Sequence, residues 1–526
     1  MIAARANIHR WIYLASLAGI AFSLPLSVFT CSLFQFLLFL NYLFEGQYHL
    51  KWERIRGNRA FLIFTLFYLL HFLGGLWSTD LAYWLKDLWI KIPLLVIPLV
   101  VSSSGTIGRR EQRYILLAFV GGVFVSSLAS AGAMAGLYAT DLNGFRSYSL
   151  FISHIRFSLM IVLAIFLAAW ILIDDANNLP RSWKLFYGLC LLWFPVFLLM
   201  LKALTGIVIA LAVALFFGFR FALRLRDQVY RYMLTAIIFL IPLLSLLYLS
   251  SAIKTYFTKD EIVEEEIDRY TRLGNPYTNH PRSTVTENGH YVWMYVCDLE
   301  LDSAWNSVSE IDFRGETLNG NPLRSTLIRF LASKNLRKDA YGLSQLSADE
   351  IRAIEHGTAN YLYMKRLSLY SRLYELIWEI DHYRNGSSPN EKSIVQRYYY
   401  LKAGCHIARE HWLTGVGNGD VQVAFEAYYE RVGSPLSQKW RRRAHNQYLT
   451  LFISFGVFGF IICMGALLLP VSFSGRGRQV QVMAFMLIFL LSMLNEDTLE
   501  TSVGAAFIAF FYAFFLLLPR ESEDTA

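Results

Sequence analysis

The sequence predicts an all-α polytopic membrane protein with about twelve transmembrane helices and a large, mostly helical loop before the last three spans. Composition supports this fold class. Hydrophobic residues make up 55% of the 526 residues, whereas charged residues make up 17%. Soluble globular domains carry about 25% charged residues. The shortfall is concentrated in long apolar runs, which is typical of a chain that crosses a membrane many times.

A transmembrane helix needs about 20 apolar residues to cross a hydrocarbon core of about 30 Å. Twelve runs approach this length: 11–27, 28–44, 60–76, 84–101, 114–138, 156–174, 184–200, 203–219, 232–250, 446–470, 479–494 and 501–519. The first two meet near Pro25 and the seventh and eighth meet near Lys202, so both junctions are predicted to be tight hairpins. The first run is expected to be a retained helix, because no small-x-small cleavage site follows it. An even number of spans places both termini on one side.

The distribution of basic residues orients the predicted helices. If the N-terminus is cytoplasmic, the inner segments carry eighteen Lys and Arg residues and the short outer segments carry five. The outer five are Lys86, Lys91, Arg146, Arg156 and Lys202. Because basic residues are enriched in cytoplasmic loops, both termini are predicted to be cytoplasmic. The same bias accounts for the net charge of +8, so we expect membrane lipids as partners and no nucleic acid.

This orientation divides the chain into three parts. Residues 1–250 are expected to hold spans one to nine, residues 251–445 form an outer loop domain, and residues 446–526 hold the last three spans and a short tail. Apolar spacing within 349–381 predicts amphipathic helices in the loop. Cys297 and Cys405 both lie in this loop and could pair in an oxidising space, a question that their spacing leaves open.

The five outer cations oppose the trend that the other eighteen follow. A cation that enters the hydrocarbon costs a few kcal/mol, so something must compensate it. Lipid headgroups reached by snorkelling are one explanation, and an anionic ligand shared by several cations is the other. Lys202, between two apolar runs, and Arg156, two residues after His154, are the candidates for such a ligand.

Acidic residues at the outer face offer a simpler partner for some of these cations. Asp87 lies between Lys86 and Lys91, so one of the two lysines can be its ion-pair partner. The last outer turn contains three carboxylates, those of Glu496, Asp497 and Glu500. They are interpreted as a solvated turn or as counter-ions for arginines, or alternatively as groups that orient a base or bind an acceptor.

Two further motifs lie at the end of the predicted loop. The glycine-rich run 415–420 contains Gly417 and Gly419, and such a run is more often a turn or helix cap than a phosphate cradle. It is not a P-loop, because no Gly-Lys-Ser/Thr follows. The run 441–449 then places His445 and Asn446 directly after three arginines, at the mouth of a span. On the outer side the orientation rule does not explain these arginines, so His445 is equally open to a structural and a functional interpretation.

These motifs resemble those of the O-antigen ligase and Wzy-type polymerase family. The run 443–449 and the later 455–459 are similar to its His-Asn-x-x-Leu signature, 415–420 is similar to its Gly-Val-Gly-x-Gly element, and Arg397 matches the arginine of an Arg-x-x-x-Leu element. The turn 496–501 resembles Bacteroidetes versions. Many members carry Ser-Arg-Gly where this chain has Lys202, so a lysine there would act on phosphate as a point charge and not as a bidentate fork.

The resemblance implies a GT-C-like glycosyltransferase in the bacterial inner membrane, with a periplasmic active site for lipopolysaccharide biosynthesis. Its donor would be a glycan on undecaprenyl pyrophosphate and its acceptor a hydroxyl of lipid A-core, in an inverting, metal-independent reaction without cofactors. An O-antigen polymerase, a protein O-oligosaccharyltransferase and, from another class, a transporter or flippase remain alternatives. The residues assigned by the resemblance are His445 as catalytic, Arg397, Arg443, Lys202 and Arg156 as pyrophosphate-binding, and Asn446, His154, Glu496, Asp497, Glu500, Gly417 and Gly419 as supporting.

Overall fold

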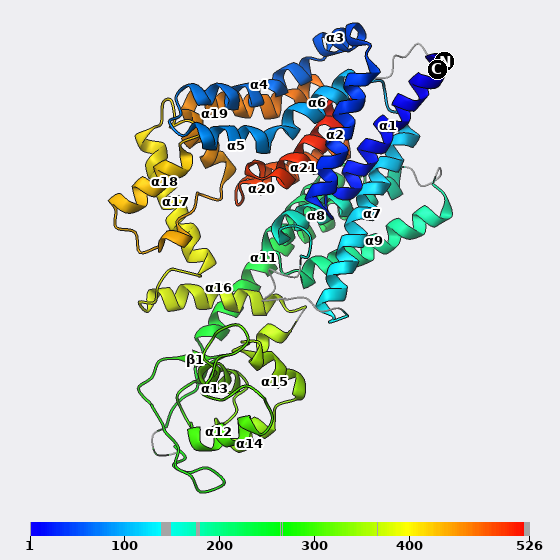
Figure 1. The fold of residues 1–526 in the computed structure, drawn as a ribbon. Helices are drawn as coiled ribbons and strands as arrows, with labels where there is room; N and C mark the ends of the chain where they lie inside the picture. The colour runs from blue at the N-terminus through cyan, green and yellow to red at the C-terminus, as the bar shows by residue number, and fades with distance from the viewer. Residues whose placement is uncertain are drawn as a thin grey trace. The chain divides into compact units, whose positions relative to one another are not determined.

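A computed structural model of the protein describes residues 2–137, 149–174, 179–263, 265, 267–365 and 367–519. Nearly all regular structure in this part is helical (Figure 1). The described residues form one sheet, in which β1 (Thr286–Glu287) pairs antiparallel with β2 (His290–Tyr291). The predicted all-α class is therefore confirmed. Arg146, one of the five predicted outer cations, lies outside the described residues.

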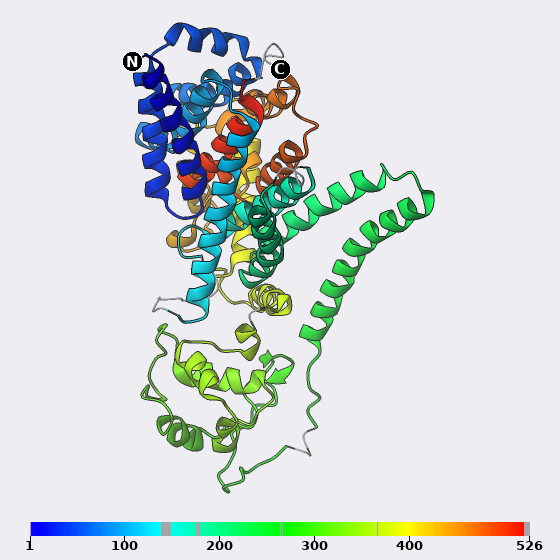
Figure 2. The ribbon, with the colours of Figure 1, turned by 90° about the vertical axis from the view of Figure 1, so that its right-hand side faces the viewer.

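The chain divides into two compact units, residues 1–217 with 386–526 and residues 218–385. The first unit is a helical bundle. Its helices are α1 (Ile2–Ser23), α2 (Val28–Glu45), α3 (Tyr48–Gly57), α4 (Arg59–Leu73), α5 (Leu81–Lys91), α6 (Pro93–Ser103), α7 (Arg109–Met134), α8 (His154–Asp174), α9 (Arg181–Met200), most of α10 (Leu204–Ala222), α17 (Ser393–Glu410), α18 (Val421–Arg431), α19 (Gln447–Phe473), α20 (Val480–Ser492) and α21 (Ser502–Tyr512). Figures 1 and 2 show α1 packed beside α2 and α7.

Within the described residues, eight helices are long and apolar enough to cross a membrane. They are α2, α4 with the turn that follows it, α7, α8, α9, α10, α11 (Gln228–Phe257) and α19. The predicted run 84–101 is divided between α5 and α6, because Pro93 occupies the first position of a new helix. Helices α20 and α21 are shorter than a full span. The multi-pass character is therefore confirmed, whereas the number twelve stays a prediction.

Both predicted hairpins are present in the bundle. Only residues 24–27 separate α1 from α2, and only residues 201–203 separate α9 from α10. Lys202 in the second hairpin has a φ of 51°, in the left-handed region that non-glycine residues rarely adopt. Its side chain is buried, so the tight turn directs this lysine into the bundle.

Helix α4 connects two polar ends of the bundle. At the first end, Asn58 Nδ2 donates to the Leu517 carbonyl over 3.0 Å, and Arg54 donates to the Ser103 carbonyl over 3.1 Å. Arg10 pairs with Glu111 at the start of α7. At the second end, the glycine after α4 approaches the glycine-rich run 415–420. The segments predicted to be cytoplasmic thus gather at one end, and which side of a membrane that end faces stays a prediction.

The second unit has a hydrophobic core of its own. Trp305 and Phe330 are fully buried among aliphatic residues. Its helices are α11, α12 (Asp298–Asn306), α13 (Leu323–Ser333), α14 (Ala340–Ser344), α15 (Ala348–Glu355) and α16 (Leu369–Arg384). Helices α15 and α16 fall where amphipathic helices were expected.

The rest of the predicted loop belongs to the first unit, because α17 and α18 pack on α19 through Tyr400, Phe425 and Ile453. The second unit therefore covers less than residues 251–445. All five cysteines of the chain are free, Cys297 and Cys405 included.

Candidate functional site

The turn between α20 and α21, residues 493–501, is the centre of the polar end that carries the candidate residues; we call it the acidic turn. Glu496 is 6% exposed and Asp497 is 9% exposed. The interpretation as a solvated turn is therefore wrong. The interpretation as counter-ions is confirmed, since Glu496 pairs with Arg397 and Glu500 pairs with Arg443.

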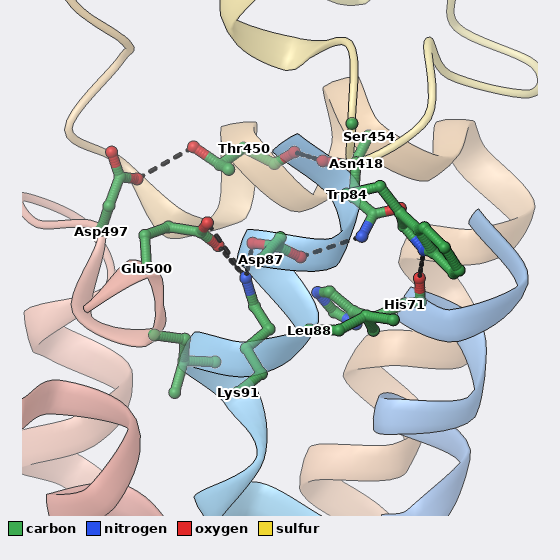
Figure 3. A network of polar contacts seen from close by, with 12 residues as sticks. His71, Trp84, Asp87, Leu88, Lys91, Asn418, Thr450, Ser454, Asp497 and Glu500 are labelled. Atoms are coloured by element: carbon green, nitrogen blue, oxygen red, sulfur yellow. Dashed lines mark hydrogen bonds and ion pairs between the residues drawn. The ribbon is translucent and has the colours of Figure 1, made fainter. Parts of the chain in front are cut away.

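Glu500 holds together one half of this end, which we call the paired side: Asp87, Lys91, Arg443 and Glu500. The Nζ atom of Lys91 lies 3.0 Å from the Glu500 carboxylate and also pairs with Asp87 (Figure 3). Arg443 Nη1 lies 3.4 Å from Glu500 Oε2. Of the two lysines that the sequence offered as partners for Asp87, Lys91 forms the ion pair, and it is 1% exposed. Two cations thus face two carboxylates, with Lys91 and Asp87 buried and Arg443 and Glu500 partly buried.

The charge state of Glu500 follows from these contacts. Burial alone would raise its pKa, but Lys91 and Arg443 outweigh burial and lower the pKa of this carboxyl well below its ordinary value. Gln447 adds a hydrogen bond of 3.0 Å from Nε2 to Glu500 Oε1. Glu500 is therefore ionised at neutral pH and cannot serve as an acid or base there.

Arg443 belongs to the paired side and also has an unused donor. Its guanidinium lies 4.6 Å from the ring centre of Tyr83, in a cation–π arrangement. Its Nη2 atom is buried and has no hydrogen-bond partner among the described residues. Arg443 is thus fixed by Glu500 on one edge while the other edge stays available.

The glycine-rich run 415–420 joins the paired side to the end of α4. Asn418 Nδ2 donates to Asp87 Oδ2 over 2.9 Å (Figure 3), and Asp420 accepts the backbone N–H groups of Thr79 and Asp80, each over 2.7 Å. Gly417 has a φ of +88°, and a Cβ there would lie 2.3 Å from Ser78 Oγ.

Gly419 approaches the same serine, with its N–H 3.1 Å from Ser78 Oγ. The backbone at Gly417 and Gly419 therefore lies so close to Ser78 that only glycine fits at these two positions. Gly417 and Gly419 thus pack against Ser78 on either side of Asn418.

Arg397 on α17 anchors the other half, which we call the open side: Arg156, Arg397, His445 and Glu496. Arg397 Nη2 lies 2.9 Å from Glu496 Oε1, and Nη1 donates to the Asn495 carbonyl over 2.9 Å. Asn495 Nδ2 in turn donates to Thr205 Oγ1 over 2.8 Å, at the start of α10. One asparagine thus connects Arg397 to the hairpin that carries Lys202.

Arg156 is the third residue of α8, which begins at His154, and it has fewer partners than Arg397 among the described residues. Its Nε atom is buried and has no hydrogen-bond partner in the described part of the chain. Glu496 and Asp497 are the carboxylates whose charges act on it. Two guanidinium groups on the open side therefore face Glu496, and one of them keeps a donor unused.

His445 lies between the basic run and α19. Its φ of 50° is left-handed, and its ring centre lies 5.6 Å from that of Tyr400. The next residue, Asn446, caps α19 by accepting the Leu449 N–H over 3.0 Å and donates to the Leu494 carbonyl over 2.9 Å. The cap and the acidic turn therefore fix the backbone that carries the imidazole.

The pKa of His445 is lowered from its ordinary value of 6.5, first by burial and then by the positive charges of Arg397, Arg442 and Arg156, against the opposing effect of Glu496. The imidazole is therefore neutral at pH 7. A neutral imidazole within reach of two arginines can accept a proton while the arginines hold an anion.

Asp497 lies in the acidic turn with Thr450 as its hydrogen-bond donor, at 2.9 Å (Figure 3). Burial, followed by the charge of Glu500, raises the pKa of Asp497 to about 6. This carboxyl therefore titrates near neutral pH. It is a second candidate for proton exchange, although its contact with Thr450 also gives it a structural role.

The sequence identified most of these residues but not how they divide. Arg397, Arg156 and His445 come together, whereas Arg443 is paired with Glu500. Lys202 and His154 lie on neighbouring elements, and both have polar partners of their own. Asn495, Asn418, Gln447 and Thr450 were not selected as site residues. Asn495 and Asn418 lie inside motifs that were selected, so polar residues within those motifs were the available signal.

The comparison with protein families assigns a family to part of this site. Residues 357–464 match the model of the O-antigen ligase family. The match includes Arg397, the glycine-rich run 415–420 and His445, and it ends before the acidic turn. No curated protein matches the chain. The resemblance seen in the sequence is thereby confirmed, because residues 357–464 of this multi-pass membrane protein are similar to the O-antigen ligase family.

Proposed function

We propose that the protein is an O-antigen ligase-like glycosyltransferase that moves a glycan from undecaprenyl pyrophosphate to a hydroxyl of lipid A-core. The proposal rests on one observation above all. A histidine with a lowered pKa lies where the charges of Arg397 and Arg156 act on it, and both His445 and Arg397 fall in the segment that the family match covers. This combination supplies a proton acceptor and an anion-binding group in the same place.

The reaction that fits these groups is a displacement at the anomeric carbon. The acceptor hydroxyl oxygen forms the new glycosidic bond while the bond from C1 to the diphosphate oxygen breaks. The electron pair leaves with the lipid diphosphate, and the acceptor proton goes to His445. Attack opposite the leaving group inverts the anomeric configuration. The donor is already activated, so neither ATP nor a metal or cofactor is part of this proposal.

The arginines act on the leaving group. Negative charge accumulates on the diphosphate as the bond breaks, so fixed cations stabilise the transition state more than the ground state. Arg156 presents the buried Nε that lacks a partner among the described residues, and the Arg397 side chain is 30% exposed. Lys202 would add a point charge from the hairpin, and Arg443 would add its unused Nη2 from the paired side.

Glu496 has a complementary role before the donor binds. It pairs with Arg397 and opposes the effect of the arginines on His445. The contact between Glu496 and Arg397 keeps the arginine oriented before the donor arrives, and a bound diphosphate would then replace part of it. The acidic turn thus positions the cations and is not a site for the acceptor.

Under the proposal, the chain lies in the bacterial inner membrane, with this end of the bundle in the periplasm and both termini in the cytoplasm. The distribution of basic residues between the loops supports this orientation. Lipid-linked glycan in the outer leaflet and lipid A-core would then meet at the open side.

The test is transfer by the purified protein, supplied with lipid-linked glycan and lipid A-core. His445→Ala and Arg397→Ala should each remove transfer while the protein still folds. Arg431→Ala is the matched control, because Arg431 lies in the same family segment but pairs with Glu410 at the exposed surface. Full activity in either site variant would refute the role assigned to that residue.

The product distinguishes the remaining alternatives. Glycan on lipid A-core would identify a ligase, longer glycan on the lipid carrier a polymerase, and glycan on protein an oligosaccharyltransferase. In a deletion strain, rough core with accumulated lipid-linked polymer would support the ligase, whereas core capped with a single repeat would support the polymerase.

A further inference from the structure

A second concentration of charge lies at the opposite polar end of the first unit. A cavity of about 570 Å³ is bounded by the start of α7, the end of α8, the segment between α19 and α20, and the residues after the π-helical turn Ala513–Leu517. Four arginines line it: Arg109, Arg113, Arg476 and Arg478. Among the described residues that line it, Asp174 carries the only carboxylate, so four positive charges of this part of the chain face one negative charge.

Two of the four arginines have no carboxylate partner in the described part of the chain. Arg109 and Arg478 are both exposed, and neither forms an ion pair there. Their guanidinium groups are therefore available to a ligand. They come from segments more than 350 residues apart, so their convergence is a property of the fold and not of one basic run in the sequence.

One helix N-terminus adds to this positive charge. Helix α20 begins at Val480, which lines the cavity, whereas the start of α7 at Arg109 is already capped by the Glu111 carboxylate, which accepts the Gly108 N–H over 2.9 Å. The N-cap of α20, Gln479, makes no capping hydrogen bond with its side chain. The first N–H groups of a helix have no partner within the helix, and the helix dipole gives this end a partial positive charge. Arginines together with a helix N-terminus are an anion site.

Part of the remaining cavity wall is polar, with Gln112, Gln479 and Gln481, and part is apolar. Trp170, Leu116 and Leu518 line it beside the arginines. A neighbouring cavity of about 390 Å³ shares Arg476 with the first and adds Arg54 and Arg59. A ligand with a phosphate group and an apolar body suits this combination better than a free ion, because a free ion would leave the apolar wall in contact with water.

We infer that this cavity binds the phosphate headgroup of an anionic phospholipid. Enrichment of basic residues on one side of a membrane explains why arginines occur at this end, but not why four of them line one cavity with the N-terminus of α20. Arg110 illustrates the difference. It follows Arg109 directly, yet it does not line the cavity and lies 5.8 Å from the ring centre of Tyr114. The inference does not depend on the proposed glycosyl transfer.

The test is lipid binding by the full-length protein in a neutral detergent, followed by thermal unfolding. Short-chain phosphatidylglycerol should raise Tm saturably, whereas short-chain phosphatidylcholine should not. The double variant Arg109→Gln/Arg478→Gln should weaken phosphatidylglycerol binding about tenfold or more, because it removes two charged donors. The control Arg110→Gln/Arg181→Gln removes the same charge outside the cavity and should change binding by no more than about twofold.

Three results would overturn the inference. They are equal binding of phosphatidylcholine, an equal loss in the control variant, and an equal rise in Tm with inorganic phosphate, which would mean a free-phosphate site. Phospholipid retained through purification, measured by mass spectrometry without added lipid, is a second readout that needs no unfolding transition. Wild type and the control should retain phosphatidylglycerol, and the double variant should retain less. Equal retention in all three would also contradict the inference.

Discussion

The paired and open sides of the acidic turn hold the same kinds of residue in opposite states. On the paired side, Lys91 and Arg443 face Asp87 and Glu500, so charges balance within buried ion pairs. On the open side, Arg156 and Arg397 face Glu496, and Arg156 keeps a buried donor without a partner among the described residues. Cations that look alike in the sequence thus differ in whether carboxylates balance their charges.

This difference indicates which residues hold the fold and which are available for chemistry. A buried charge that loses its partner destabilises a protein strongly, so the paired side is expected to govern stability. A buried donor without a partner is costly unless a ligand uses it, so the open side is expected to govern activity. The predictions below test this division.

The largest effect is expected at Glu500. Glu500→Gln leaves Lys91 and Arg443 buried without their shared carboxylate, so the free energy of unfolding should fall by about 3–5 kcal/mol. Thermal unfolding of the purified protein measures it. The control is Glu410→Gln, which breaks exposed pairs with Arg431 and His406 and should cost no more than about 1 kcal/mol. A Glu500→Gln variant as stable as this control would contradict the buried pairing.

A smaller loss of stability is expected at Gly417. Alanine there must adopt a φ of +88° and meet Ser78 Oγ, so Gly417→Ala should destabilise the protein by about 1–3 kcal/mol. Below the unfolding temperature, transfer per folded molecule should be unchanged, because the loop supports packing. Gly433 also has a positive φ, but a Cβ there would meet nothing within 4 Å, so Gly433→Ala separates backbone strain from the close contact. A specific loss of transfer in Gly417→Ala would restore the phosphate-cradle interpretation.

The open side should behave in the reverse way. Arg156→Met removes a buried charge that has an unused donor, so Tm should stay constant or rise while transfer falls by at least about tenfold. Enzyme kinetics and thermal unfolding on the same preparation give both quantities. A variant that loses stability in proportion to activity would place Arg156 with the structural residues.

Much of the fold was predictable from the sequence, because long apolar runs in a membrane protein mainly form membrane-spanning helices. The helical class, both hairpins and the separation of basic and acidic segments follow from hydropathy and charge. The division of run 84–101 at Pro93 was missed, since a proline within an apolar run leaves hydropathy unchanged while it ends a helix. Hydropathy also does not indicate that the polar helices α17 and α18 pack on α19 through aromatic residues.

The sequence predicted most residues of the candidate site but not the contacts between them. His445, Arg397 and the acidic turn were selected from motifs, but the roles of Asn495 and Asn418 depend on segments that lie hundreds of residues away in the sequence. Lys91 shows the same limit. Its spacing from Asp87 indicated a local pair, whereas its contact with Glu500 comes only from the fold.

The pH dependence of transfer tests most directly whether neutral His445 takes the acceptor proton. Its pKa is lowered from 6.5, so we predict a rate that falls only below pH 6.5 and stays level from there to about pH 8. Asp497, with a pKa of about 6, titrates nearby, so Asp497→Asn should keep this acidic limb while His445→Gln should lose it with most of the activity. An unchanged acidic limb and rate in His445→Gln would contradict the proposed role of His445.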